Sequence, residues 1–375
     1  MDALTTPLPK DWKKVRLGDI GKPCMCKRVM KHQTTRYGEI PFYKIGTFGN
    51  TADAFISKKL FLEYKTKYSF PKKGDILISA SGTIGRAVIY DGKPAYFQDS
   101  NIVWIDNDET LVKNDFLFYA YSNVKWNTEH TTILRLYNDN FRNTLIPLPP
   151  LNEQIAIANI LSGLDRYLYS LDALILKKES VKKALSFELL SQRKRLKGFN
   201  QAWQKVKLGD IANYLTSNLS VEQITQQGKI KVYDVNNFIG YTDTTFISDK
   251  PYISIVKDGS VGRVRILPPK TNILSTMGAL IANHRTTTEF LFYLLSNFDF
   301  KNFTSGSIIP HIYFKDYKEK TIFLPPLNEQ IAIANILSAL DNEIASLKNK
   351  KRQFENIKKA LNHDLMSAKI RVLKK

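Results

Sequence analysis

The stretch LPPLNEQIAIANILS at Leu148–Ser162 occurs again, without a mismatch, at Leu324–Ser338. The two copies are 176 positions apart (324 minus 148). Each copy opens a long segment with a helical pattern, and each follows an aromatic-rich stretch that differs strongly between the two halves. The chain is therefore an internal duplication of a divergent module followed by a similar helix.

Shorter matches show that the divergent stretches are also related. WKKVRLGDI at Trp12–Ile20 returns as WQKVKLGDI at Trp203–Ile211, and ASGTIGR at Ala80–Arg86 returns as KDGSVGR at Lys257–Arg263. The first module spans 136 positions (148 minus 12) and the second 121 (324 minus 203), a difference that we expect in surface loops. The predicted domains are two modules at 1–150 and 199–326 and two helices at 151–198 and 327–375.

The two helical segments begin with the same signals. Residues 152–196 and 328–372 contain no proline, and each segment begins after Pro-Pro. Asn152 and Asn328 are placed to cap the helices. Glu153 and Glu329 lie in the first turn, where the helix dipole favours a negative charge. A continuous helix over either range would be about 67 Å long at ~1.5 Å per residue, so each helix needs a partner along its length.

Apolar residues in these segments recur at steps of three and four, which is typical of a coiled coil. They are Leu161, Leu164, Leu168, Leu171 and Ile175 in the first segment, and Leu337, Leu340, Ile344, Leu347, Phe354, Ile357 and Leu361 in the second. We expect the two helices to pair as an antiparallel coiled coil with pseudo-twofold symmetry. The alternative is two unrelated amphipathic helices, each lying on its own module.

The modules have the pattern of mixed α/β domains with short strands, which makes the fold class α+β. Strands are expected within 40–46, 75–82, 87–92 and 101–106, and short helices within 114–124 and 288–298. The two short helices share the pattern FLFYxxSN. Their aromatic residues Phe118, Tyr119, Phe292 and Tyr293 are expected in the core, with base stacking as the alternative.

The composition favours a polyanionic partner. The formal net charge is +20 and the isoelectric point about 9.6, which point to DNA, RNA or an anionic membrane surface. No apolar run is long enough to span a bilayer, and the N-terminal sequence lacks the features of a secretory signal, so we expect a cytoplasmic protein that does not bind membranes. Cys24 and Cys26 are expected to be free thiols. A metal site that includes His32 is the alternative, although the usual second pair of ligands is missing.

Candidate DNA contacts are basic and polar residues expected on loops. CKRVMKHQTTRYG clusters five cationic or imidazole side chains, TTILRLYNDNFR precedes the first long helix, and SGSIIPHIYFKDY occupies the same place before the second. At the offset of 176, His311 is opposite Arg135, Tyr313 opposite Tyr137, and Lys315 opposite Asp139. The predicted contacts are Lys27, Arg28, Lys31, Arg36, Lys44, Arg86, Arg135, Tyr137, Asn138, Arg142, Arg263, His284, Arg285, His311, Tyr313 and Lys315.

Arg86 and Arg263 follow a Gly-x-x-Gly turn that could contact phosphate or could simply join two strands. The identical helix starts suggest symmetrical docking of two copies of another protein. The expected subunit interface is Asn152, Glu153, Gln154, Asn328, Glu329 and Gln330.

The motifs of common enzymes do not occur. There is no G-x-x-x-x-G-K-[ST] loop for ATP, no Asn-Pro-Pro-[Tyr/Phe] step, no glycine-rich cofactor turn and no clustered acidic nuclease motif. We therefore expect no catalytic residues, no metal and no cofactor on this chain.

Taken together, W-x-x-V-x-L-G-D-I, the strand and turn at Asp75–Gly85, GSIIPHIYFKDY at Gly306–Tyr317 and the repeated LPPLNEQ resemble the specificity subunit of type I restriction-modification enzymes. The resemblance covers nearly the whole chain. It implies two target-recognition domains spaced by an antiparallel coiled coil. It also implies two methylation subunits that use S-adenosylmethionine to methylate adenine, and restriction subunits that use ATP and Mg²⁺.

Three hypotheses follow. The first is a non-catalytic subunit that reads a bipartite, asymmetric duplex target and assembles the methylation and restriction subunits. The second is a stand-alone architectural or regulatory DNA-binding protein in which the coiled coil is only a scaffold. The third is an enzyme with its own methylation or nuclease centre, which the missing motifs disfavour.

Overall fold

The computed structural model describes residues 8–130 and 134–373 of the 375-residue chain. The chain divides into two compact units, one within residues 1–171 and 350–375 and the other formed by residues 172–349. Each unit contains one module and one end of each long helix. The unit that holds the first module is called unit 1 below, and the unit that holds the second module is called unit 2.

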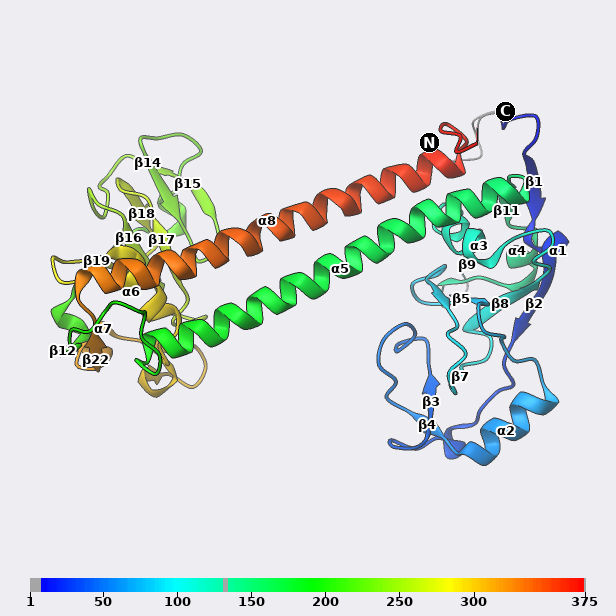
Figure 1. Cartoon of the computed structure of the whole chain (residues 1–375), viewed down its shortest axis with the longest axis horizontal. Helices are drawn as coiled ribbons and strands as arrows, with labels where there is room; N and C mark the ends of the chain where they lie inside the picture. Colours follow the sequence, from blue (N-terminus) through cyan, green and yellow to red (C-terminus); the bar gives the residue numbers. More distant parts are fainter. Residues whose placement is uncertain (1–7, 131–133, 374–375) are drawn as a thin grey trace. The chain divides into compact units, whose positions relative to one another are not determined.

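The two predicted long helices are present and equal in length. They are α5 (Leu151–Leu190) and α8 (Leu327–Met366), with 40 residues each, and each is continuous in Figure 1. Both begin one residue before the expected asparagine, so the prediction that Asn152 and Asn328 precede the helices as caps was wrong. Each asparagine lies in the first turn, where its Oδ1 accepts the N–H of the next residue at 2.9 Å.

Both long helices end at equivalent positions, Leu190 and Met366, before the predicted ends at 198 and 375. Two residues after each end, Gln192 and Ala368 adopt left-handed backbone conformations with φ of 61° and 56°. This conformation cannot continue a right-handed helix. The stops therefore come from a change of backbone conformation, with no proline or glycine at the turning residue.

The long helices pack antiparallel in each unit. In unit 1, Lys358 pairs with Asp165, and the rings of Phe354 and Tyr167 lie 4.7 Å apart between centroids. In unit 2, Lys178 Nζ lies 2.8 Å from Glu343 Oε1, and Lys182 pairs with Asp341. Residue numbers rise along one helix as they fall along the other. The predicted antiparallel coiled coil is confirmed.

One predicted residue of the apolar stripe lies outside it. Ile357 is 49% exposed, whereas its neighbour Lys358 is turned toward Asp165 of the other helix. An ion pair therefore replaces an apolar contact at this turn. The reason is a tertiary contact, because Lys358 also lies over the Tyr119 ring, 5.6 Å from its centroid.

The first module is built on a four-stranded sheet with the order β2-β8-β5-β6 and a three-stranded sheet with the order β4-β3-β7. Neighbouring strands are antiparallel except for β3 and β7, which are parallel. The predicted strands are confirmed. The strands of the two sheets are β2 (Gly21–Met25), β8 (Ile102–Asn107), β5 (Ile76–Ser79), β6 (Ala87–Ile89), β4 (Phe55–Ile56), β3 (Ile40–Tyr43) and β7 (Tyr96–Phe97).

The second module repeats this topology. Its sheets have the orders β13-β19-β16-β17 and β15-β14-β18, again with one parallel pair, β14 and β18. The equivalence of the two modules is therefore a matter of strand order as well as sequence. The strands are β13 (Ala212–Thr216), β19 (Met277–Ala282), β16 (Tyr252–Val256), β17 (Val264–Leu267), β15 (Phe238–Thr242), β14 (Ile230–Tyr233) and β18 (Thr271–Ile273).

The smaller elements also come in pairs. Strand β1 (Lys13–Arg16) pairs with β11 (Leu145–Leu148), as β12 (Gln204–Lys207) pairs with β22 (Thr321–Leu324). A hairpin precedes each last strand, formed by β9 (Glu129–His130) and β10 (Leu134–Arg135) or by β20 (Thr304–Ser305) and β21 (His311–Ile312). The remaining short helices are α1 (Leu17–Ile20), α4 (Asn138–Asn143), α7 (Phe314–Tyr317), η1 (Lys31–Gln33), η2 (Leu208–Asp210), η3 (Val221–Gln223) and η4 (Lys301–Phe303).

One helix accounts for much of the length difference between the modules. Helix α2 (Lys58–Lys67) lies in the connection 57–75 of the first module, whereas the equivalent connection in the second, 243–251, is short and has no helix. Phe61 of α2 is 4% exposed and packs in an apolar cluster with Ile56 and Tyr96. The expected insertion is therefore a packed helix as well as a loop.

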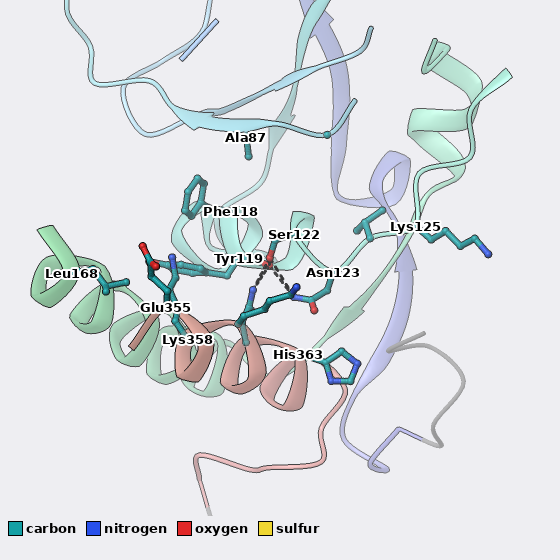
Figure 2. A pocket seen from close by; sticks show the side chains of 14 residues that line it. Ala87, Phe118, Tyr119, Ser122, Asn123, Lys125, Leu168, Glu355, Lys358 and His363 are labelled. Carbon is teal, nitrogen blue, oxygen red and sulfur yellow. Dashed lines mark hydrogen bonds between the residues drawn. The ribbon is translucent and has the colours of Figure 1, made fainter. Parts of the chain in front are cut away.

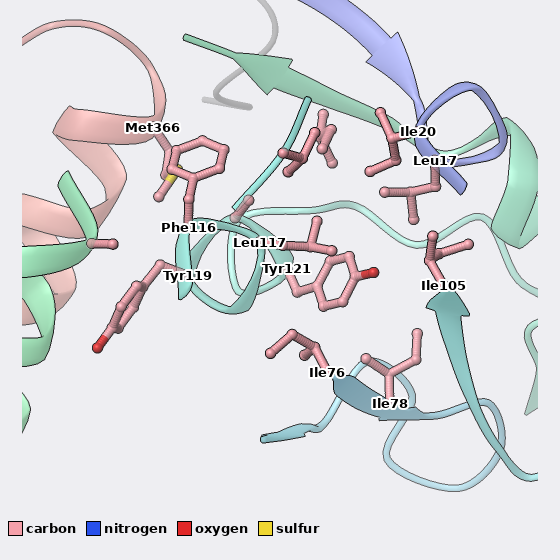
Figure 3. Packing of buried hydrophobic residues seen from close by; sticks show 14 of the residues in the cluster. Leu17, Ile20, Ile76, Ile78, Ile105, Phe116, Leu117, Tyr119, Tyr121 and Met366 are labelled. Carbon is pink, nitrogen blue, oxygen red and sulfur yellow. The ribbon is translucent and has the colours of Figure 1, made fainter. Parts of the chain in front are cut away.

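The main core of unit 1 lies between the larger sheet, α3 (Asn114–Tyr121) and the ends of the long helices (Figure 3). Phe116 of α3 and Met366 of α8 are fully buried there. In unit 2, α6 (Thr288–Ser296) has the same role. Tyr119 and Tyr293 are 6% and 5% exposed, which confirms these two as core residues, whereas Phe118 and Phe292 are half-buried and pack against the core.

A tryptophan, a glutamate and an arginine join the parts of each unit. In unit 1, Trp12 Nε1 donates to Glu153 Oε2 at 3.0 Å, and Arg371 donates to both Glu153 carboxylate oxygens at 2.7 Å. In unit 2, Trp203 and Arg195 make the same contacts with Glu329. The glutamates are buried, and a buried carboxylate is destabilising unless it is paired and hydrogen-bonded. These contacts are called the Trp–Glu–Arg clamps below.

Candidate nucleic-acid interface

The glycine turns join strands in both modules. Residues 80–86 connect β5 to β6, and residues 257–263 connect β16 to β17. Gly85 and Gly262 have φ of +82° and +80°, and a Cβ there would lie 2.1 Å from Trp126 and 2.6 Å from Phe300. The turns therefore do join two strands, and the phosphate contact of Arg86 and Arg263 stays a prediction. Arg86 and Arg263 are exposed just after these turns.

Arg135 lies on strand β10 with its guanidinium held by the first module. Its Nη2 donates to Asn101 Oδ1 at 2.9 Å and approaches Ser100 Oγ at 3.4 Å. Ser81 Oγ donates to the same Asn101 oxygen at 2.8 Å. The side chain of Arg135 is therefore held by neutral partners and by no carboxylate in these hydrogen bonds.

Other predicted cations lie near this part of the first module. Arg28 is exposed and its Nε is 3.9 Å from Asp99, the residue before Ser100. Gly49 lies beside the Arg86 side chain, since a Cβ added to this glycine would be 3.3 Å from Arg86 Nε. Gly82 lies beside Ile45, the residue after Lys44, since a Cβ added there would be 3.7 Å from the Ile45 side chain. Lys44 is paired with Asp53 at 2.8 Å, which holds the pKa of that carboxyl below its usual value. These contacts bring Arg28, Lys44 and Arg86 close to the turns that surround Arg135.

His311 occupies the place of Arg135 in the second module, on strand β21. Its Nδ1 lies 2.7 Å from Asp258 Oδ1, and the two side chains are 35% and 29% exposed. Tyr313 is 49% exposed with its ring stacked 6.5 Å from the His311 ring, and Lys315 lies over the Tyr313 ring. Three of the predicted DNA contacts thus form one exposed cluster.

The remaining predictions for the first module fall in two places. Lys27, Lys31 and Arg36 are exposed along the segment around η1, where Lys27 lies over the Tyr68 ring. Asn138 and Arg142 belong to helix α4 and line a cavity of about 470 Å³ beside Gly18, with Tyr137 just before them. The expectation that 131–142 forms a loop was wrong for the described residues, because Leu134–Arg135 is a strand and Asn138–Asn143 a helix.

Arg285 is tied to the scaffold instead of the His311 cluster. Its carbonyl accepts a hydrogen bond from Gln330 Nε2 at 3.0 Å, and its guanidinium approaches Gln204 Oε1 at 3.3 Å. It therefore lies at the start of α8. His284, the residue before it, is exposed.

Four of the six residues predicted for a subunit interface are buried. Glu153 and Glu329 form the Trp–Glu–Arg clamps, and Gln154 and Gln330 bond backbone groups of their own modules. All four are at most 2% exposed, so their side chains are not available to another protein in this structure. Their role in an exposed surface has to be corrected, because the identity of these residues is explained by contacts inside the chain.

The repeat nevertheless presents the same exposed side chains in both units. Asn152 and Asn328 are exposed, as are Asn159 and Asn335. Beside them, Leu151 and Ile155 are 37% and 45% exposed, and Leu327 and Ile331 are 45% and 49% exposed. Leu151, Ile155 and Asn159 lie at steps of four, as do their counterparts in α8, and each of Asn152 and Asn328 lies three positions before the isoleucine, so each set shares one face. We call the eight residues the repeat faces.

A cavity of about 1060 Å³ in unit 1 lies between α3 and α8 (Figure 2). Asn362 Nδ2 donates to Ser122 Oγ at 2.6 Å, and Tyr119 donates to Asp165 at 2.7 Å. An equivalent cavity of about 380 Å³ in unit 2 is lined by Tyr293, Ser296, Asn297, Glu179, Lys182, Lys183 and Ser186. These residues attach each module to the long helices.

Two signals in the sequence could have located residues that were missed. ESVKKALSFELL at Glu179–Leu190 and ENIKKALNHDLM at Glu355–Met366 repeat at the same offset of 176, and they supply Lys182 and Lys358 to the helix pairing. Ser81 and Asp258 precede the first glycine of the two aligned turns. Sequence comparison placed them opposite each other, but only the structure shows that they reach Asn101 and His311.

None of the described helices combines the length and apolar character needed to cross a membrane. Within the described residues there is also no group of three or more His, Cys, Asp or Glu side chains that could hold a metal ion. Cys24 and Cys26 are separate thiols, and burial raises the pKa of Cys26 to about 12.

Comparison with known proteins gives one family. The model for the "Type I restriction modification DNA specificity domain" matches residues 9–178 and again residues 200–356. The two matches correspond to the two copies of the duplication and cover most of the chain.

Curated relatives agree with this match. The chain is 28% identical to the MjaX specificity subunit and 26% identical to the MjaVIII specificity subunit of type I restriction enzymes from Methanocaldococcus jannaschii, over 97% of this chain in both cases and 95% and 94% of those proteins. It is 63% identical to the Haemophilus influenzae specificity subunit S.HindORF215P over 150 residues, which are 40% of this chain and 39% of that protein.

Solved structures show the same fold. The S subunit of a type I restriction-modification system from M. genitalium superposes with a TM-score of 0.64 at 20% identity, covering 96% of this chain and 98% of that one. A chain from a study of complex assembly and conformational transition of the type I system has a TM-score of 0.56 at 16% identity, with the same coverage.

Proposed function

Because this chain belongs to the family of type I restriction-modification DNA specificity subunits, we propose that it reads a bipartite, asymmetric duplex sequence, one half through each module. The observation that supports this most is the exchange of Arg135 for His311 at equivalent places in modules of the same topology. A guanidinium and an imidazole present different hydrogen-bonding groups to base edges. Two modules with the same fold but different side chains at this place suit two half-sites of different sequence.

The charge of the chain supports binding to the DNA backbone. The net charge is +20, and Lys27, Lys31, Arg36, Arg86 and Arg263 are exposed. Such side chains neutralise phosphates, so the affinity should fall steeply with salt concentration. We assign these five to phosphate contacts and Arg135, His311 and Tyr313 to base recognition.

We propose further that the repeat faces dock two methylation subunits, one on each face. Leu151, Ile155, Leu327 and Ile331 are exposed apolar side chains that the fold of the described residues does not cover. Their identity in the two units favours two copies of the same partner, since a single surface of that partner would fit both. Restriction subunits would join the resulting complex.

The chain itself is proposed to be non-catalytic and to act on DNA in the cytoplasm. S-adenosylmethionine, ATP and Mg²⁺ would be bound by the partner subunits. The stand-alone architectural role is not favoured by the family match. Copurification from native cells without any methyltransferase would support that role, and methyl transfer by the purified chain alone would show a catalytic centre that we do not expect.

DNA binding by the assembled complex tests the proposed function. We expect selective binding to a target with two different halves, at least about 10³-fold tighter than to unrelated duplex. The absence of any base preference in the assembled complex would contradict it.

Substitution of the repeat faces tests the docking surface. Ile155→Asp and Ile331→Asp should each reduce the number of bound methylation subunits from two to one, and the double variant should bind none, as measured by native mass spectrometry. Leu176→Asp is a matched control, because Leu176 is 66% exposed on α5 but outside the repeat. Loss of both subunits in a single variant would contradict separate docking.

A further inference from the structure

The Asp258–His311 and Ser81–Arg135 positions are structurally equivalent. Each pair forms an isolated antiparallel bridge between the residue before a turn glycine and a hairpin strand. One backbone hydrogen bond next to each bridge is also equivalent. The N–H of Leu136 donates to the carbonyl oxygen of Ala80, and the N–H of Ile312 donates to that of Lys257, both at 2.9 Å. The fold therefore places one turn residue against one strand residue in both modules.

The chemistry at this bridge differs in both members of the pair. In the first module the strand residue is a cation and the turn residue is a buried neutral serine, with Asn101 accepting hydrogen bonds from both. In the second module the strand residue is His311 and the turn residue is Asp258, a carboxylate. The arginine of the first module is thus hydrogen-bonded to neutral side chains, whereas the histidine of the second module is hydrogen-bonded to a carboxylate.

A carboxylate accepts but does not donate when ionised, so the Asp258 contact requires a proton on Nδ1 of His311. This leaves Nε2 as the nitrogen that can meet an outside partner. It accepts a hydrogen bond when the ring is neutral and donates one when the ring is protonated. Without Asp258, the neutral ring could carry its proton on either nitrogen, and its hydrogen-bonding preference would be lost.

The hairpin holds the ring at another edge. Gly306 has φ of +91°, and a Cβ there would lie 3.0 Å from His311 Cδ2 and 2.3 Å from the carbonyl oxygen of Ile309. The backbone at this glycine therefore lies against the imidazole. Within the described residues, the ring is held by Asp258, Gly306 and Tyr313, and 35% of its side-chain surface is still exposed.

The surroundings of His311 suit duplex DNA. Ile308 at the tip of the hairpin is 93% exposed and Ile309 is 54% exposed, next to the exposed Tyr313 and Lys315. Apolar side chains contact thymine methyl groups or wedge between base steps, and a lysine beside them can bind phosphate. A solvated hairpin tip would not require two exposed isoleucines.

From this geometry we infer that Asp258 is a positioning residue that presents Nε2 of His311 to one base pair of the half-site read by the second module. The inference rests on the proposed function. The turn residue and the strand residue then determine specificity together, so a substitution of either one alone should reduce discrimination between base pairs.

The test uses the complex assembled with its methylation subunits and a duplex that carries the target. Affinities are measured for that duplex and for variants with each base pair replaced in turn, using the wild type, Asp258→Ala, His311→Ala and the double variant. Asp316→Ala is the matched control, because it removes an exposed carboxylate from the same segment without a contact to His311. Melting temperatures are recorded for all complexes.

We expect Asp258→Ala and His311→Ala to reduce discrimination at the same base pair by about 5- to 100-fold, with little further loss in the double variant. Discrimination in the other half-site should stay unchanged, as should the whole profile of Asp316→Ala. Effects of the two variants at different base pairs, or a uniform loss of affinity over all duplexes, would overturn the inference. A wild-type complex without any base preference would instead refute the proposed function itself.

Discussion

Unit 1 holds Arg135 against the Asn101 amide, and unit 2 holds His311 against the Asp258 carboxylate, yet the Trp–Glu–Arg clamps of the two units are alike within 0.5 Å in each hydrogen bond. The parts that attach a module to the long helices have been kept after the duplication. The parts that face outward beside the glycine turns have changed in charge and in hydrogen-bonding groups. One scaffold therefore carries two different outward surfaces.

The clamps give the largest expected effect. Arg195→Ala leaves the buried Glu329 carboxylate without its charged partner, and Arg371→Ala does the same to Glu153. Each should lower the free energy of unfolding of its unit by about 3 to 5 kcal/mol. Urea unfolding followed by tryptophan fluorescence measures this, since Trp203 is the one tryptophan in 172–349.

Arg36→Ala is the control for the clamp variants, because Arg36 is exposed. It should leave the unfolding curve unchanged. A large loss from Arg195→Ala with none from Arg371→Ala would break the equivalence of the two clamps.

Helix α2 is where the units differ in structure. Phe61→Ala should destabilise unit 1 by about 3 to 4 kcal/mol through the cavity it leaves. It should not alter unit 2, which has no counterpart among its described residues. Hydrogen exchange of the two units, compared with Lys59→Ala at an exposed site of the same helix, would show whether the effect crosses between them.

The tyrosines that reach the long helices test the shared attachment more finely. Tyr119→Phe and Tyr293→Phe each remove one hydrogen bond to a partly exposed aspartate, at 2.7 and 2.8 Å, and should cost about 1 to 2 kcal/mol. A measurable difference between the two variants would show that the attachments have diverged.

Burial, together with the bond to Asp165, raises the pKa of Tyr119 above its ordinary value. Because the pKa of Tyr119 is raised in the folded state, the stability that its protonated hydroxyl contributes is fully present below about pH 10. This stability is lost as the pH rises further. The stability of Tyr119→Phe should therefore decline less steeply than that of the wild type above pH 10. Parallel decline of the two proteins would contradict this account of the tyrosine.

The helix ends give the smallest effect, and it is a gain. Gln192 and Ala368 adopt left-handed conformations that glycine tolerates at lower cost. Gln192→Gly and Ala368→Gly should each raise stability by up to about 1 kcal/mol, measured by thermal unfolding. Ala360→Gly inside α8 is the opposite control and should lower it by about 1 kcal/mol.

Most of the fold could be predicted because the pattern is local. The 40-residue helices follow from runs without proline, and the short strands of the first module from β-branched and aromatic residues between turns. The error at Ile357 came instead from contacts between residues far apart in the sequence. Ile357 continues the heptad pattern, but Lys358 faces the partner helix because Asp165 and Tyr119 attract its charge.

The candidate site could be predicted only in part, because its contacts join residues far apart in the sequence. The offset of 176 correctly placed His311 opposite Arg135. The offset could not show that Asp258 Oδ1 lies 2.7 Å from His311 Nδ1. Nor could it show that the carboxylates of Glu153 and Glu329 are hydrogen-bonded to tryptophan and arginine inside the chain. The identity of the repeated segments indicated that their residues are constrained. Only their burial in the structure showed which residues are constrained by contacts inside the chain and which are free to contact a partner.

Mapping of methylated bases in cells tests whether one scaffold carries two modules that each recognise their own half-site. The wild type, Arg135→Ala and His311→Ala would each be expressed with their methylation subunits in a host that lacks the target modification. We predict a bipartite motif with two different halves for the wild type, with one half relaxed in Arg135→Ala and the other half relaxed in His311→Ala. Relaxation of the same half, or of both halves, by the two substitutions would contradict the account.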